Sequence, residues 1–149
     1  MLTIEVKQSI DESVLCWLAT VDSDGFPNCS PKEIFTYFGD KHLIVANIAS
    51  PNSVSNIQAN TNVCVSFVHV FKQKGFKLKG QAIYADPTDE DYKEPLELLQ
   101  SIAGTAFPIQ GVILIEVSSV ERVIAPGYYL VDGATEESQI ESAKRTYGV

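Results

Sequence analysis

The residues best suited to chemistry are hydroxyl and amide side chains that follow a predicted buried strand. Leu43–Ala46 is a short, apolar, β-branched run that predicts the strand, and Ser50-Pro51 has the pattern of a helix N-cap followed by proline at the first helical position. Backbone N–H groups are free at a helix start. Those of Asn52 and Ser53, with the hydroxyls of Ser50 and Ser53, could therefore bind an anion such as phosphate. An ordinary capped helix would use the same residues, so this stretch alone leaves both interpretations open.

A polar interruption in the preceding predicted strand could contribute to the same site. The strand over 27–38 carries Ser30-Pro31-Lys32-Glu33 between apolar ends. Proline within a strand removes a ladder hydrogen bond, and the two charges beside it suggest that the strand lines a cavity there. Basic residues also gather at Lys74, Lys77 and Lys79, where they form either a solvated strand face or an anion-binding one.

Other catalytic and metal-binding arrangements are not supported by the sequence. The three cysteines, Cys16, Cys29 and Cys64, are widely spaced and lack metal-ligand spacing, which argues against a zinc site or a disulfide framework. Cys64 and His69 lie five residues apart on one predicted strand, so their side chains are expected on opposite faces. Glycine-rich phosphate loops and dinucleotide-binding fingerprints are absent. The remaining polar groups suit cofactor binding better than a catalytic triad.

The overall composition is that of one globular domain spanning residues 1–149. Hydrophobic residues make up 45% and charged residues 20% of a chain that fits the usual size of a single domain. The net charge of −8 argues against nucleic acid or anionic lipid as the main partner. The first residues lack the pattern of a signal peptide, and no apolar run approaches the roughly 20 residues of a membrane span. A cytoplasmic location without membrane contact is therefore expected.

Apolar patterns and turn residues predict short strands joined by tight turns. Strands are expected at 13–21, 27–38, 43–46, 62–71, 76–85 and 111–124, with a further extended segment at 128–130. Helices are expected at 3–10, after Ser50, within 86–104 with Thr88 and Asp91 spaced as a capping box, and after the N-cap Thr135. Five or six short antiparallel strands of this kind indicate a closed or partly open β-barrel.

Four stretches carry a resemblance to a known family. They are Asp24–Glu33, Leu43–Asn60, Val63–Phe67 and Gly75–Ala82. In this order and spacing they resemble the pyridoxamine 5′-phosphate oxidase-like, FMN-binding split-barrel family, over most of the chain from Val14 to Val123. The resemblance implies a mainly β fold: a six-stranded antiparallel split β-barrel with short flanking helices. It also implies a homodimer that binds FMN at its interface.

The resemblance assigns cofactor contacts to particular segments. Ser30-Pro31-Lys32 would face the flavin and its ribityl phosphate, and the backbone of Asn47-Ile48-Ala49 would meet the edge of the isoalloxazine ring. Family members commonly place Lys or Arg beside the phosphate, where this chain has Asn52 next to Ser53. The positive charge is therefore expected from Lys32 or from a lysine within 74–79. The candidate cofactor-binding residues are Ser30, Pro31, Lys32, Asn47, Ile48, Ala49, Ser50, Asn52, Ser53, Lys74, Lys77 and Lys79.

The function that the resemblance implies is that of a flavoprotein oxidoreductase. Its FMN would transfer hydride or electrons through flavin N5 between an electron donor and an unknown small-molecule substrate. A non-catalytic electron carrier or flavin sensor is the alternative, because no acid, base or substrate clamp is evident. A haem- or deazaflavin-binding relative is a third hypothesis, with His69 as the candidate iron ligand. Residues 123–149 lack the arginine-rich segment of the dedicated oxidase, so pyridoxamine phosphate oxidase activity itself is not expected.

Overall fold

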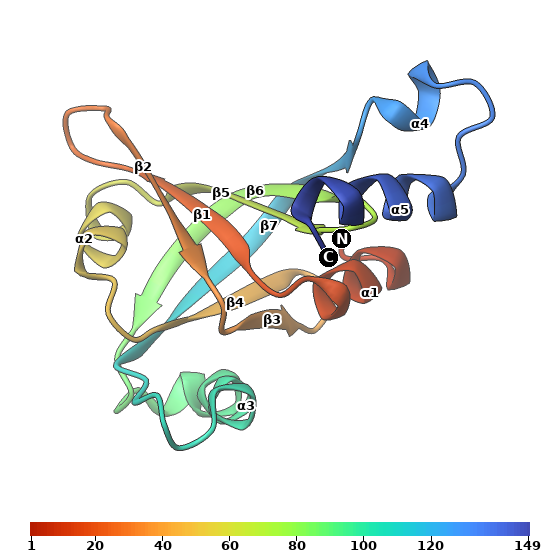
Figure 1. The fold of residues 1–149 in the computed structure, drawn as a ribbon. Helices are drawn as coiled ribbons and strands as arrows, with labels where there is room; N and C mark the ends of the chain where they lie inside the picture. The colour runs from red at the N-terminus through yellow and green to blue at the C-terminus, as the bar shows by residue number, and fades with distance from the viewer.

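The main feature of the computed structural model, which describes all residues 1–149, is one curved antiparallel sheet of seven strands in the order β2-β1-β5-β6-β7-β4-β3 (Figure 1). The strands are β1 (Cys16–Val21), β2 (Pro27–Lys32), β3 (Phe35–Phe38), β4 (His42–Asn47), β5 (Asn62–His69), β6 (Lys74–Ala85) and β7 (Gly111–Ile124). The helices are α1 (Ile4–Glu12), α2 (Pro51–Ala59), the 3-10 helix η1 (Glu90–Tyr92), α3 (Lys93–Ala103), α4 (Gly127–Leu130) and α5 (Glu136–Tyr147). The expected split barrel is confirmed, with seven strands rather than six.

The additional strand arises because the single strand predicted over 27–38 is two strands. β2 pairs with β1 and ends at Lys32, whereas β3 pairs with β4 at the opposite edge of the sheet. Only Glu33 and Ile34 connect these two edges, and the Ala46 N–H donates to the Ile34 carbonyl at 2.9 Å. So short a connection holds the two edges together at one corner, and the sheet must curl into a barrel to allow it.

Apolar side chains from alternate strand positions fill this barrel. The fully buried side chains include Leu18, Val65, Phe67, Leu78 and Ile113. β4 is buried on both faces: Leu43 and Val45 belong to the barrel core, whereas Ile44 and Ala46 pack in a second cluster with Leu99 of α3. Burial on both faces explains why β4 reads as a continuous apolar run rather than an alternating one.

The helices cover different parts of the sheet. α2 packs against β1 and β6, α1 packs mainly against β5 and β6, and α3 packs against β3 and β4. Figure 1 shows α1 and α5 together with both chain termini at one end of the barrel, and α2 at the other end. None of the helices has the length and the apolar character that crossing a membrane requires.

Two local predictions at helix starts are wrong. Residues 128–130, expected to be extended, belong to α4, because Pro126 has a φ of −57° that suits a first helical turn and its carbonyl accepts from the Leu130 N–H at 2.9 Å. The capping box expected at Thr88 and Asp91 does not form. The Asp91 N–H instead donates to the Asp89 side chain at 3.1 Å, so the cap of η1 lies one residue later than predicted.

The N-cap predicted at Thr135 is confirmed. Its hydroxyl accepts from the Ser138 N–H at 3.1 Å, and the Ser138 hydroxyl accepts from the Thr135 N–H at 2.9 Å. This reciprocal pair satisfies two free donors at the start of α5 and fixes where the last helix begins.

Candidate functional site

The candidate site is built around the turn from β4 into α2. Ser50 occupies the N-cap position of α2, yet its side chain does not cap the helix. The Ser50 hydroxyl accepts a hydrogen bond from Lys32 Nζ at 2.5 Å instead, and the Ser50 N–H donates to Asn47 Oδ1 at 3.0 Å. Lys32 therefore contacts the residue at the start of α2.

Lys32 is buried without a carboxylate partner. It is 8% exposed, and it is the only residue with a charged side chain among the buried residues. No Asp or Glu oxygen lies within ion-pair distance of its ammonium group, although the chain has 19 acidic residues. Burial lowers the pKa of Lys32 from its ordinary value, because a charge removed from water is destabilised.

The electrostatics of α2 add to this positive charge. A helix N-terminus carries about half a positive charge, which an acidic residue in the first turn usually offsets. The first turns of α1, α3 and α5 each contain Glu, whereas α2 has no acidic residue there. Lys32 and the helix dipole thus place two positive groups together, and an anion is the group that would stabilise both.

Further polar side chains meet at the same place. The hydroxyls of Ser30 and Ser53 lie 3.4 Å apart, and Ser53 is only 2% exposed. Asn56 of α2 donates to the Thr20 hydroxyl of β1 at 3.0 Å. Of the five buried polar residues, four lie in this region: Thr20, Lys32, Asn47 and Ser53. Hydroxyl and ammonium donors so arranged are suited to a phosphate group.

A cavity of about 250 Å³ opens beside Lys32 and Ser50. Its lining residues are Pro31, Lys32, Glu33, Ile34, Ala46, Ile48, Ala49, Ser50 and Phe107. The cavity is polar at Lys32, Glu33 and Ser50 and mainly apolar along its other walls, so it suits a ligand with an anionic end near Lys32 and a flat apolar body. Phe107 was not found from the sequence, because it comes from the loop after α3 and no local pattern connects that loop to α2.

A chain of hydrogen bonds links this loop to the start of α2. Asn47 Nδ2 donates to the Tyr84 hydroxyl at 2.9 Å, which donates to the Gln110 carbonyl at 3.1 Å. The Gln110 N–H in turn donates to the Asn47 carbonyl at 2.7 Å. A Cβ at Gly111 would lie 2.2 Å from the Tyr84 hydroxyl, so the close approach of Tyr84 requires glycine at this position.

The other candidate cations have different surroundings. Lys77 pairs with Glu121 at 2.9 Å, and Lys74 pairs with Glu136 at 3.1 Å. Lys77 and Lys79 are more exposed than their apolar neighbours on β6, so they lie on the outer face of the sheet. None of these three lysines makes a hydrogen bond to a residue at the start of α2. Of the four candidate cations, the structure brings only Lys32 to that position.

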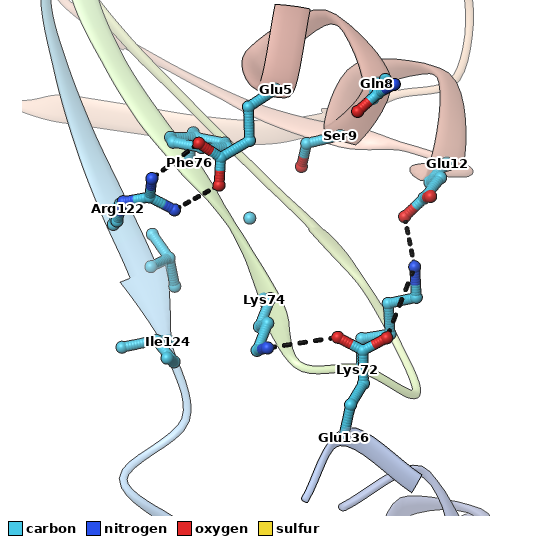
Figure 2. Close-up of a pocket in the computed structure, with 12 residues that line it drawn as sticks. Glu5, Gln8, Ser9, Glu12, Lys72, Lys74, Phe76, Arg122, Ile124 and Glu136 are labelled. Carbon is cyan, nitrogen blue, oxygen red and sulfur yellow. Dashed lines mark hydrogen bonds and ion pairs between the residues drawn. The ribbon is translucent and has the colours of Figure 1, made fainter. Parts of the chain in front are cut away.

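A second polar cleft, of about 270 Å³, lies among α1, β6, β7 and the start of α5, and it differs from the first in its charge balance. Figure 2 shows Arg122 paired with Glu5, and Lys72 placed between the carboxylates of Glu12 and Glu136. The Lys72 ammonium lies 2.8 Å from Glu12 and 3.9 Å from Glu136. Because each cation of this cleft has a carboxylate partner, the cleft ties α1 and α5 to the sheet and retains no unpaired positive charge.

His69, the candidate iron ligand, lies at the end of β5. Its Nδ1 accepts from the Lys72 N–H at 3.1 Å, and its ring meets Phe71 edge-on. The structure therefore accounts for His69 as a residue that closes the β5–β6 turn.

Comparisons with known proteins agree with this fold. The family model for pyridoxamine 5′-phosphate oxidase matches residues 2–124. A comparison with curated proteins finds no match. The crystal structure of HupZ from Group A Streptococcus is 26% identical, with a TM-score of 0.71 over 84% of this chain and 99% of that one.

More distant solved structures share the fold. An FMN-binding protein from Syntrophomonas wolfei is 16% identical, with a TM-score of 0.66 over 83% of this chain and 87% of that one. An F420 reductase is 19% identical, with a TM-score of 0.57 over 80% of this chain and 98% of that one. Since the family model covers most of the sequence, the chain belongs to the pyridoxamine 5′-phosphate oxidase-like family.

Proposed function

We propose that this protein binds FMN with its phosphate at the start of α2 and acts as an oxidoreductase. The family and its FMN-binding neighbour indicate a flavin cofactor. The observation that carries the proposal is the buried Lys32, which has no carboxylate partner and lies at the positive end of a helix. A phosphate monoester carries close to two negative charges near pH 7, so it would neutralise both positive groups.

The side chains at this site include hydrogen-bond donors for a phosphate and apolar surface for a ring system. The ammonium of Lys32 has three N–H donors, of which one is used by Ser50. The hydroxyls of Ser30 and Ser53, 3.4 Å apart, share one hydrogen bond, which leaves one further hydroxyl donor between β2 and the start of α2. Lys32, Ser50 and Ser53 would hold the phosphate, and the apolar walls formed by Ile48 and its neighbours would exclude water from the ring.

The cofactor is also expected to require a second copy of the chain. Ligand sites usually measure about 300–1,000 Å³, and the cavity beside Lys32 measures about 250 Å³ and is open to solvent. One chain would therefore leave part of a flavin exposed. Trp17, 48% exposed on the outer face of β1 and paired in register with Pro31, offers apolar surface for a partner beside the cavity. We thus propose a homodimer with FMN at its interface.

FMN, when bound, supplies hydride and electron transfer, and the protein supplies orientation. The substrate or electron donor would be a small molecule that enters beside the flavin. One observation favours the alternative of an electron carrier or flavin sensor: the only carboxylate that lines the cavity, Glu33, is exposed to solvent, and no histidine lines it. The cavity of one chain thus lacks a shielded proton donor for a substrate.

The test is to purify the protein, release its chromophore and identify that chromophore by absorbance and mass. We expect FMN in a ratio near one per chain, retained when the protein is reconstituted after chromophore removal. Failure to bind FMN after reconstitution would overturn the proposal. Anaerobic addition of NADH or NADPH then separates the two functions: reduction with turnover supports the oxidoreductase, and a flavin that neither donor reduces supports the carrier or sensor.

A further inference from the structure

We infer that Phe107 is the side chain that covers the ring system of the ligand bound at the start of α2. The inference rests on the proposed function and adds to it a residue that contacts the ring. Phe107 lines the cavity beside Lys32, yet it is 51% exposed. A large aromatic side chain half exposed at the rim of an apolar cavity is the arrangement expected of a surface that a planar ligand completes.

Exposure alone would not distinguish Phe107 from other apolar surface residues. Leu98 and Ile102 of the preceding helix are 39% and 45% exposed, but neither lines the cavity. Phe107 is the one aromatic residue in the cavity wall, and it is also the one lining residue from the loop that joins α3 to β7. It thus approaches the cavity from a segment separate from the β2–β3 and β4–α2 connections that form the remaining walls.

The loop that carries Phe107 is held at both ends. Gly104, with a φ of +71°, ends α3, and the backbone N–H of Gln110 donates to the Asn47 carbonyl at 2.7 Å. The same Asn47 accepts from the Ser50 N–H through its side chain. A single buried residue, Asn47, therefore sets the position of the phosphate-binding turn and of the loop that carries the aromatic ring.

The chemistry of the contact predicts its size. An aromatic side chain packed on a planar ring system contributes an amount that corresponds to about a two- to tenfold change in affinity. Because the contact involves the ring rather than the phosphate, its loss should weaken FMN and riboflavin, which lacks the phosphate, by the same factor. An indole ring stacked on a flavin quenches its fluorescence by electron transfer, which a phenyl ring does not do, so a tryptophan placed at position 107 should report the contact by quenching the emission of bound flavin.

The experiment compares three variants of the full chain by titration with FMN and with riboflavin. We expect Phe107→Ala to weaken both ligands about two- to tenfold. Phe107→Trp should keep the wild-type affinity and quench the emission of bound FMN. Leu98→Ala is the matched control and should change neither.

The outcomes separate this inference from the proposed function. If Phe107→Ala and Phe107→Trp bind FMN with wild-type affinity and emission, the role of Phe107 is overturned while FMN binding stands. If Phe107→Ala weakens FMN but not riboflavin, Phe107 acts at the phosphate end, and the inference is equally overturned. If the wild-type chain binds neither flavin, the proposed function fails, and the inference fails with it.

Discussion

Replacing Lys32 by methionine should weaken FMN binding and stabilise the protein without FMN. Methionine has an unbranched, apolar side chain of similar length, so the substitution removes the charge with little change in packing. In the ligand-free protein it removes a buried cation that lies at the positive end of α2 without a carboxylate partner. In the complex it removes the only cation that the structure brings to the start of that helix.

The two effects have opposite signs and comparable sizes. Loss of a charge-assisted hydrogen bond to phosphate costs about 1.5–3 kcal/mol, which is about a ten- to hundredfold rise in the dissociation constant of FMN. In the free protein, relief of the buried charge exceeds the loss of the Lys32–Ser50 hydrogen bond, and we expect a net gain of about 1 kcal/mol. For a chain of this length that gain raises the Tm by about 2–4 °C.

The assay combines FMN titration by fluorescence with thermal unfolding of the FMN-free protein. Lys79→Met is the matched control, because Lys79 is an exposed lysine of β6 without an ion pair, and it should change neither quantity by more than a small amount. Wild-type FMN affinity in Lys32→Met would show that the phosphate binds elsewhere. A lower Tm in the FMN-free variant would show that the charge of Lys32 is already compensated within the chain, and the physical basis of the site would then be wrong.

Three further predictions address other parts of the structure. Ser53→Asp should abolish FMN binding in equilibrium dialysis, because its carboxylate would repel the phosphate and pair with Lys32, whereas Ser53→Ala should weaken binding only slightly. Gly111→Ala should lower both the Tm and the FMN affinity, because its Cβ would meet the Tyr84 hydroxyl at 2.2 Å; overpacking of this kind costs about 1–3 kcal/mol, and unchanged unfolding curves would contradict it. Burial raises the pKa of the Cys16 thiol from 9.0 to about 12, so the folded chain keeps a proton that the unfolded chain loses above pH 9. The free energy of unfolding, measured in urea, should therefore fall between pH 9 and about 11 by up to about 1.4 kcal/mol per unit, and this slope should be shallower in Cys16→Ala.

Much of the fold follows from local sequence patterns. The strand β7, Gly111–Ile124, was predicted with its observed bounds, because a long apolar run lies between a glycine and the Ala125-Pro126-Gly127 break. The N-cap at Thr135 was predictable for a similar reason, since capping depends on residues close together in the chain. Features of this kind depend only on residues that are close together in the chain, so they can be predicted without knowing how distant segments pack.

The separation of β2 from β3 could not be predicted in the same way. Residues on both sides of Glu33 and Ile34 favour extended backbone, and no local property distinguishes one long strand from two short ones. The division is set by pairing, because β2 hydrogen-bonds to β1 and β3 to β4. The proline in Ser30-Pro31-Lys32-Glu33 marked an irregularity, and Pro31 does lie on an edge strand, but the change of partner depends on how the whole sheet curls.

The residues near Phe107, at the end of the candidate site away from Lys32, could not be predicted from the sequence either. Asn47, Tyr84 and Gln110 are separated by 37 and 26 residues along the chain, and only the pairing of β7 with β6 and with β4 brings them into one chain of hydrogen bonds. The position of Phe107 beside the cavity depends on the same pairing, because its loop leads into β7. A scan for motifs finds neither, because a lone tyrosine or phenylalanine in a predicted strand or loop carries no local mark of its role.

At the phosphate end of the site, burial and ion pairing distinguish lysines that the sequence alone does not separate. From the sequence, Lys32, Lys74, Lys77 and Lys79 were equal candidates for the missing cation. In the structure, Lys74 and Lys77 have carboxylate partners and Lys79 is exposed, whereas Lys32 is buried and has no carboxylate partner. In a chain with 19 acidic residues and a net charge of −8, a buried lysine without a carboxylate partner would be stabilised in its charged form by an anion from another molecule. An anionic ligand at the start of α2 would supply that charge, and the phosphate of FMN carries enough of it.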